Sequence, residues 1–163
     1  MKTMHRAAAS VLLASLGAAA SLAWPASAAA QATPTENTVV AVAVGTVGSE
    51  AASEPVVFAG QASITGKVIY DTVFGAPPVL QLIVDLSQVT GRGQRTGTAY
   101  RVAGQAILHR PLQAFDVIDL SFSFGPAGDF ALSRSALASF GVYYNATSGV
   151  STTPMTISTL PPA

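Results

Sequence analysis

The sequence predicts an all-β protein: an antiparallel β-sandwich of about six to eight strands, with a small up-and-down β-barrel as the alternative. Two observations carry this prediction. Apolar and polar residues alternate with a period of two through most of residues 56–146, which is typical of strands with one buried face. Short stretches rich in Gly, Pro, Asn and Ser interrupt the alternation where turns would lie.

The first thirty residues have the organisation of a secretory signal peptide. Lys2 and Arg6 form a basic start, residues 7–23 carry no charge, and small residues for cleavage follow at 26–28. The apolar run is at the lower length limit for a membrane span, so a cleaved signal is favoured over an uncleaved anchor. We therefore expect residues 1–30 to be removed and the bacterial mature protein to be periplasmic or extracellular, with no transmembrane segment left.

Residues 31–54 are rich in Ala, Thr, Ser and Glu, and we expect a flexible N-terminal segment there. Within it, β-branched residues at 38–47 predict an edge strand. Residues 55–160 are expected to form a single antiparallel β domain. Its strands are predicted at 56–70, 79–89, 98–108, 112–124, 138–146 and 150–158. Pro154 interrupts the last of these, which favours an edge position for it.

The connection at 129–137 bears on the choice between sandwich and barrel. It is the one connection long enough to cross from one sheet to another, and it therefore favours the sandwich. Gly60, Gly66 and Gly104 lie at inward positions of the predicted strands, where they would permit the sharp coiling of a barrel. The barrel is kept as the alternative for this reason.

Composition argues against several classes of function. Beyond the signal, six Lys and Arg face eight Asp and Glu, a net charge of −2, which does not provide the positive field of a nucleic-acid-binding protein. The chain has no Cys, so disulfides, a thiol nucleophile and a Cys-based metal site are excluded. His109 is the only histidine after the signal, and no Gly-x-Ser-x-Gly motif accompanies it. Asp116 and Asp119 are predicted on opposite faces of one strand, which suits no carboxylate pair.

The loop at 91–98 is the most distinctive candidate for ligand binding. Arg92, Arg95 and Thr96 stand on a glycine-rich turn, where guanidinium, hydroxyl and backbone N–H groups would hold an anion. The alternative is a solvated hairpin tip in which glycine supplies the turn geometry. Gln105 and Tyr143 are added as candidates because they share the uncharged, hydrogen-bonding outer face of the strands.

These observations predict an exported, non-enzymatic β domain that acts as a binding or surface-interaction module in the cell envelope. We expect an envelope protein or a glycan as its partner, and no nucleic acid, cofactor or metal. The first alternative is a small-ligand-binding barrel, with a pocket lined by Tyr70, Tyr100, Phe122, Phe140 and Tyr144. The second is a structural, pilin-like assembly subunit.

Overall fold

The computed structural model describes residues 36–48, 53–70, 74–129 and 132–161, all within the unit Gln31–Ala163. The predicted signal peptide lies outside the described residues. The described part of the chain is all β, with no α-helix. Its strands are β1 Asn37–Val47, β2 Val56–Ile69, β3 Val79–Gly93, β4 Ala99–Ala103, β5 Gln105–Pro111, β6 Phe115–Pro126, β7 Arg134–Asn145, β8 Gly149–Thr152 and β9 Met155–Thr159.

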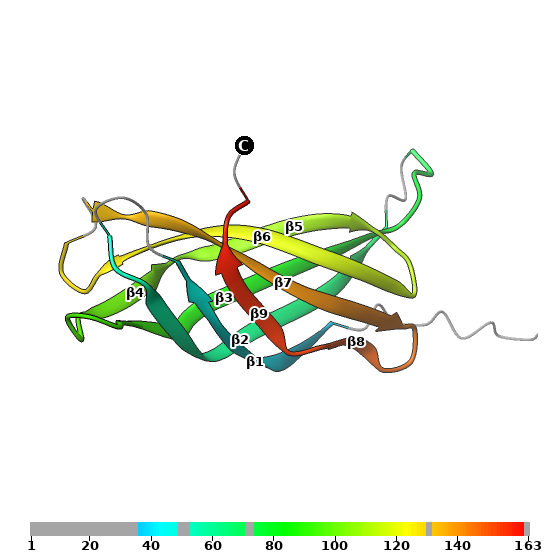
Figure 1. Cartoon of the computed structure of the whole chain (residues 1–163). Coiled ribbons are helices and arrows are strands. Elements are labelled where there is room, and N and C mark those ends of the chain that lie inside the picture. The colour runs from blue at the N-terminus through cyan, green and yellow to red at the C-terminus, as the bar shows by residue number, and fades with distance from the viewer. Residues whose placement is uncertain (1–35, 49–52, 71–73, 130–131, 162–163) are drawn as a thin grey trace, which may run out of the picture. The chain divides into compact units, whose positions relative to one another are not determined.

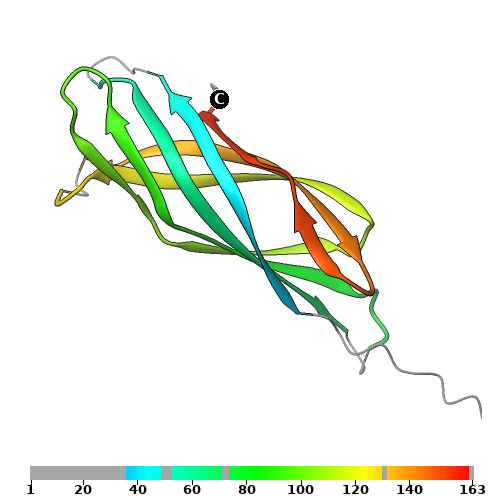
Figure 2. The same cartoon turned by 90° about the horizontal axis from the view of Figure 1, so that it is seen from below.

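Seven of these strands, namely β1, β2, β3, β4, β6, β7 and β9, form a closed barrel (Figures 1 and 2). Strands that follow one another around the barrel are antiparallel, and β1 closes the ring by pairing with β9 in parallel. The closure is parallel because an odd number of alternating strands brings the first and last into the same direction. The all-β prediction is confirmed, and the architecture is the barrel alternative instead of the favoured sandwich.

The sandwich was favoured because residues 129–137 were expected to cross between sheets. In the structure β7 begins at Arg134, which pairs with Phe124 of β6. The connection is therefore a hairpin between neighbouring strands, and no crossover occurs there. β2 and β3 approach closely at one of the inward glycines named for the barrel alternative, since a Cβ at Gly60 would lie 2.3 Å from the carbonyl oxygen of Gln88. Gly104, by contrast, is exposed, and a Cβ there would have no neighbour within 4 Å.

The first and last strands are paired more fully than the sequence suggested. β1 was predicted as an edge strand, yet it pairs with β2 on one side and with β9 on the other. Pro154 separates β8 from β9, and Thr153 maintains the hydrogen bonding to β7 between them. The backbone N–H of Thr153 donates to the carbonyl of Gly141 at 3.0 Å, and its hydroxyl accepts from the Gly141 N–H at 2.8 Å.

Apolar side chains fill the interior of the barrel. The ring of Phe58 meets those of Phe122 and Phe124 edge to face, with centroids 6.1 and 4.9 Å apart, and such pairs add to the stability gained by burial. Phe122 and Phe140, expected to line a ligand pocket, are part of this packed core. In the described part of the chain these two rings fill the interior, so we look for a binding site in the wall and on the outside.

Candidate functional site

The glycine-rich loop at 91–98 does hold an anion, and that anion is the carboxylate of Glu54. Backbone N–H groups of Arg95 and Thr96 donate to Glu54 Oε2 at 2.8 and 2.9 Å. The Thr96 hydroxyl donates to Oε1 at 2.5 Å, and the Tyr100 hydroxyl does so at 3.3 Å. Hydrogen bonds to the ionised form, those from Thr96 above all, lower the pKa of Glu54 to about 2. Donors predicted for an external ligand are thus used within the chain.

The two arginines of this loop point to different places. Arg95 Nη2 donates to the backbone carbonyl of Ser53 at 3.0 Å, so its guanidinium also fastens the loop to the chain before β2. Arg92 lines a shallow outer hollow together with Val57 and Ala59. The structure therefore places Arg95 and Thr96 in a structural cluster and leaves Arg92 at the surface.

Tyr143 and Gln105 lie on two further parts of the wall. Tyr143 on β7 stands beside Phe115 on β6, with ring centroids 4.8 Å apart and planes inclined by 40°. Both rings are about half exposed. Gln105 opens β5 and borders a notch in the wall. The five predicted ligand residues are consequently not brought together into one site.

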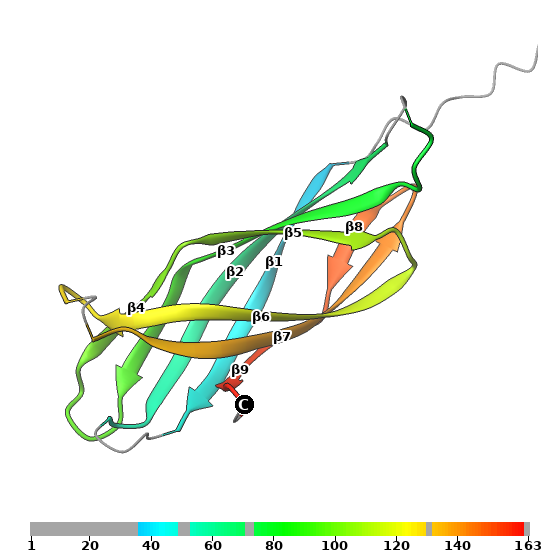
Figure 3. The same ribbon diagram turned by 90° about the horizontal axis from the view of Figure 1, so that it is seen from above.

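The notch lies where the barrel wall splits between β5 and β6. The chain turns away from β6 at Gly104, whose φ of +90° favours glycine. Before that turn β4 pairs with β6, with Val102 opposite Phe124. After it β5 pairs only with β3, and no pairing joins β5 to β6. Figure 3 shows the two strands diverging from β4 and converging again toward the loop that links them. We call this opening the β5–β6 slit.

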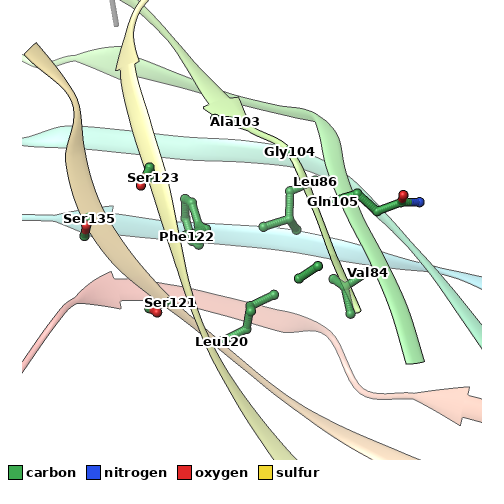
Figure 4. Close-up of a pocket in the computed structure, with 11 residues that line it drawn as sticks. Val84, Leu86, Ala103, Gly104, Gln105, Leu120, Ser121, Phe122, Ser123 and Ser135 are labelled. Atoms are coloured by element: carbon green, nitrogen blue, oxygen red, sulfur yellow. The ribbon is translucent and has the colours of Figure 1, made fainter. Parts of the chain in front are cut away.

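The notch within the slit combines an apolar floor with a polar rim. Its volume is about 300 Å³. Side chains of Val84, Leu86, Leu120 and Phe122 gather between the two strands (Figure 4). Gln105 on β5, Ser121 and Ser123 on β6 and Ser135 on β7 complete the lining, and the Gln105 amide points away from the apolar side chains (Figure 4). Nearly buried apolar groups bordered by a few hydrogen-bonding groups are typical of ligand sites.

An ion pair closes the far end of the slit. Arg110 of β5 donates from Nε to Asp116 Oδ2 at 2.6 Å and from Nη2 to Oδ1 at 3.2 Å. The hydrogen bond from Arg110 is the main cause of the lowered pKa of Asp116. The pair joins two strands that have no backbone pairing, so the slit is bounded at one end by β4 and at the other by Arg110 and Asp116.

His109 and Asp119, which were considered from the sequence, each contact a neutral side chain on the outer surface. His109 Nε2 contacts Gln81 Nε2 at 3.0 Å on the outer surface. Asp119 faces outward and accepts a hydrogen bond from the Ser139 hydroxyl. Among the described residues no group of three or more His, Cys, Asp or Glu side chains could hold a metal ion. The same residues include no helix with the length and apolar character of a membrane span.

Comparison with known proteins finds no matching family model, no matching curated protein and no matching solved structure.

Proposed function

We propose that this protein is an exported, non-catalytic binding module and that the β5–β6 slit is its binding site. The observation that carries the proposal is the split wall itself. Two neighbouring strands remain without a common ladder over an apolar notch with a polar rim. A barrel normally removes strand edges by pairing them all. An opening retained between two neighbouring strands of a barrel wall is a natural place for a ligand.

The packed interior supports this choice of site over a pocket in the lumen. Phe58, Phe124 and Leu82 are almost fully buried inside the barrel, so a ligand would have to displace core side chains to enter it. At the slit, by contrast, Leu120 and Phe122 keep 9% and 8% of their surface exposed. These two side chains are the part of the core that a ligand would touch first.

The choice of a binding module over an enzyme rests on the chemistry around the notch. Its polar groups are serine hydroxyls and one amide, and no histidine or carboxylate is among the residues that line it. A nucleophilic serine needs a base within hydrogen-bond reach. Neutral donors and acceptors of this kind suit recognition. The signal-like residues 1–30 are the reason for placing the activity in the cell envelope.

The proposal is tested by mapping where probes bind. The protein without residues 1–30 is labelled with ¹⁵N and titrated separately with a pool of short peptides, with octanoate and with maltotriose. We expect at least one probe to shift the amide signals of residues 105–109 and 119–122. Ala106→Leu, which narrows the notch, should weaken that response. Ala59→Leu on the outer wall of β2 is the matched control and should preserve it.

Two results would contradict the proposal. In one, shifts centre on the Phe115–Tyr143 pair or on Arg92, and the site is then elsewhere on the wall. In the other, none of the three probe classes shifts the slit residues at millimolar concentration.

A further inference from the structure

We infer that the β5–β6 slit takes up an extended peptide as an additional strand, hydrogen-bonded to both of its walls. The inference rests on the proposed function and names its ligand class. Three features of the slit support it: the direction of the backbone groups along its two edges, the exposed apolar side chains beside it, and the charge on its outer rim.

On β5, the ladder with β3 fixes which backbone groups face the slit. The Leu112 N–H donates to the Pro78 carbonyl in the same register as the β3–β5 pairing. Backbone groups of an antiparallel strand point alternately to its two sides. The backbone N–H and C=O groups of the even-numbered residues of β5 therefore point toward β3. The N–H and C=O groups of Ile107 and His109 point into the slit.

On β6, one hydrogen bond near each end of the strand fixes which backbone groups face the slit. The Ala127 N–H donates to the Ala99 carbonyl at 2.9 Å, in register with the β4–β6 pairing. The Tyr144 N–H donates to the Ala114 carbonyl at 3.1 Å, in register with the β6–β7 pairing. Odd-numbered residues of β6 thus face the β4 and β5 side. Asp119 and Ser121 consequently present their backbone groups to the slit.

The slit therefore has donors and acceptors on both walls at the spacing of a β-strand. Within the described residues no strand pairs with these edges. An extended peptide satisfies such edges through its own backbone, as in β-strand addition. A compact small molecule in the notch would leave most of them unpaired. This difference favours the peptide.

Side chains beside the slit define what the peptide would carry. Ile107 and Val117 lie on the outer surface of the two walls and are 57% and 53% exposed, so outward side chains of an inserted strand would cover them. The notch has room for one inward apolar side chain. Asp119 places a carboxylate on the outer rim. A peptide with an apolar inward residue and a cationic outward residue is therefore complementary.

The test uses a pool of acetylated, amidated heptapeptides in which Thr and Ser alternate with Val, Leu, Ile or Phe, with Lys at one central outward position. At saturation we expect amide hydrogen exchange of Ile107 and Asp119 to slow by at least tenfold. Replacing Lys by Glu should weaken binding by about two- to fivefold, the range expected for one cross-strand charge pair. Methylating one slit-facing peptide nitrogen should weaken it by about three- to tenfold.

A proline variant of the protein tests the backbone contact itself. Ile107→Pro removes an N–H that the β3–β5 ladder does not use, and Ile107→Ala removes the same apolar side chain while keeping that N–H. We expect the alanine variant to bind the peptides and the proline variant to lose them. If Ile107→Pro does not fold, the N-methylated peptides provide the same comparison on the unaltered protein.

The inference and the proposed function fail in different ways. Octanoate that binds at the notch while no peptide slows exchange of Ile107 or Asp119 overturns the inference and keeps the slit as a binding site. Peptide binding that is insensitive to N-methylation and to Ile107→Pro also overturns it. If no probe reaches the slit, both are wrong.

Discussion

The carboxylate of Glu54 accepts a hydrogen bond from the backbone N–H of Thr96 at 2.9 Å, across 42 residues of the chain. Arg134 donates to the backbone carbonyl of Glu54 at 2.9 Å, and its guanidinium lies 5.2 Å from the centre of the Phe124 ring. One acidic residue therefore connects the chain before β2, the β3–β4 hairpin and the start of β7. These contacts hold one end of the barrel together.

The stability of the protein should fall as the pH drops from about 5 toward 2. The folded-state pKa of Glu54 is lowered to about 2. A lowered carboxyl pKa contributes stability that is fully present above the unfolded-state value, near 4.5, and is lost as the pH falls through the folded-state value. The urea midpoint, measured at half-unit pH intervals, should show this decline. Asp116, with its lowered pKa, contributes in the same direction.

Glu54→Gln should lower the midpoint at pH 7 and flatten its dependence on pH. Glu36→Gln is the matched control, because the carboxylate of Glu36 is exposed and lies 3.5 Å from Lys67 Nζ. The control should retain the pH profile of the unaltered protein. An equally steep profile in Glu54→Gln would contradict the assignment.

Arg134→Lys should destabilise the protein by about 1–3 kcal/mol, the range for lost hydrogen bonds from a charged donor. The guanidinium of Arg134 reaches the carbonyls of Glu54 and Gly48 with two different nitrogens, and a single ammonium cannot reproduce that fork. Equilibrium unfolding in urea measures the loss. Arg92→Lys, at the surface of the same end, should stay within about 0.5 kcal/mol of the unaltered protein.

Asn37→Ala should open a second seam of the wall, between β1 and β8. The side-chain amide of Asn37 donates to the Val150 carbonyl at 2.8 Å and accepts from the Val150 N–H at 2.7 Å. It therefore makes the two hydrogen bonds that a backbone residue of β1 would make if β1 and β8 were paired. Losing both bonds should cost about 1–3 kcal/mol, with faster amide exchange at Val150. Thr38→Ala, which removes an exposed hydroxyl contact with Thr65, is the control and should change neither quantity substantially.

Gly45→Ala should disrupt the closure of the barrel. A Cβ at Gly45 would lie 1.8 Å from the carbonyl oxygen of Ile157 on β9, so β1 and β9 would have to separate. We expect a loss of about 1–3 kcal/mol, as in other overpacked sites, and faster exchange of the β9 amides. At Gly48 the nearest atom to an added Cβ is 3.4 Å away. Gly48→Ala should therefore be nearly neutral, and equal effects of the two substitutions would refute this role of Gly45.

The strands of this protein follow well from the sequence, and their closure does not. Alternation placed Ile118, Leu120 and Phe122 on an inward face, and all three are in the core. Alternation reports which side of a strand is buried, but it does not report which strand lies beside it. The hairpin at Arg134 was for that reason interpreted as a crossover.

The candidate site was predictable only in part. Gln105 was selected as an outward polar residue, and it borders the notch. The slit itself could not be foreseen. It depends on how β5 and β6 lie relative to each other, and each strand taken alone has the usual alternation of a paired strand. Glu54 was missed for a similar reason. A buried acid whose partners lie 41 to 46 residues away carries no local pattern.

The parallel closure between β1 and β9 determines how the barrel would respond to mechanical force. Asn37 at the start of β1 contacts Val150, whereas Thr159 at the end of β9 accepts a hydrogen bond from the N–H of Gly48, just beyond the other end of β1. The outer ends of the two strands are therefore separated by the length of an eleven-residue strand, roughly 33 Å. Tension between them would load the β1–β9 pairing in shear, so that its hydrogen bonds break together. A meander with an even number of strands would instead bring those ends side by side, and the same tension would unzip the pairing bond by bond.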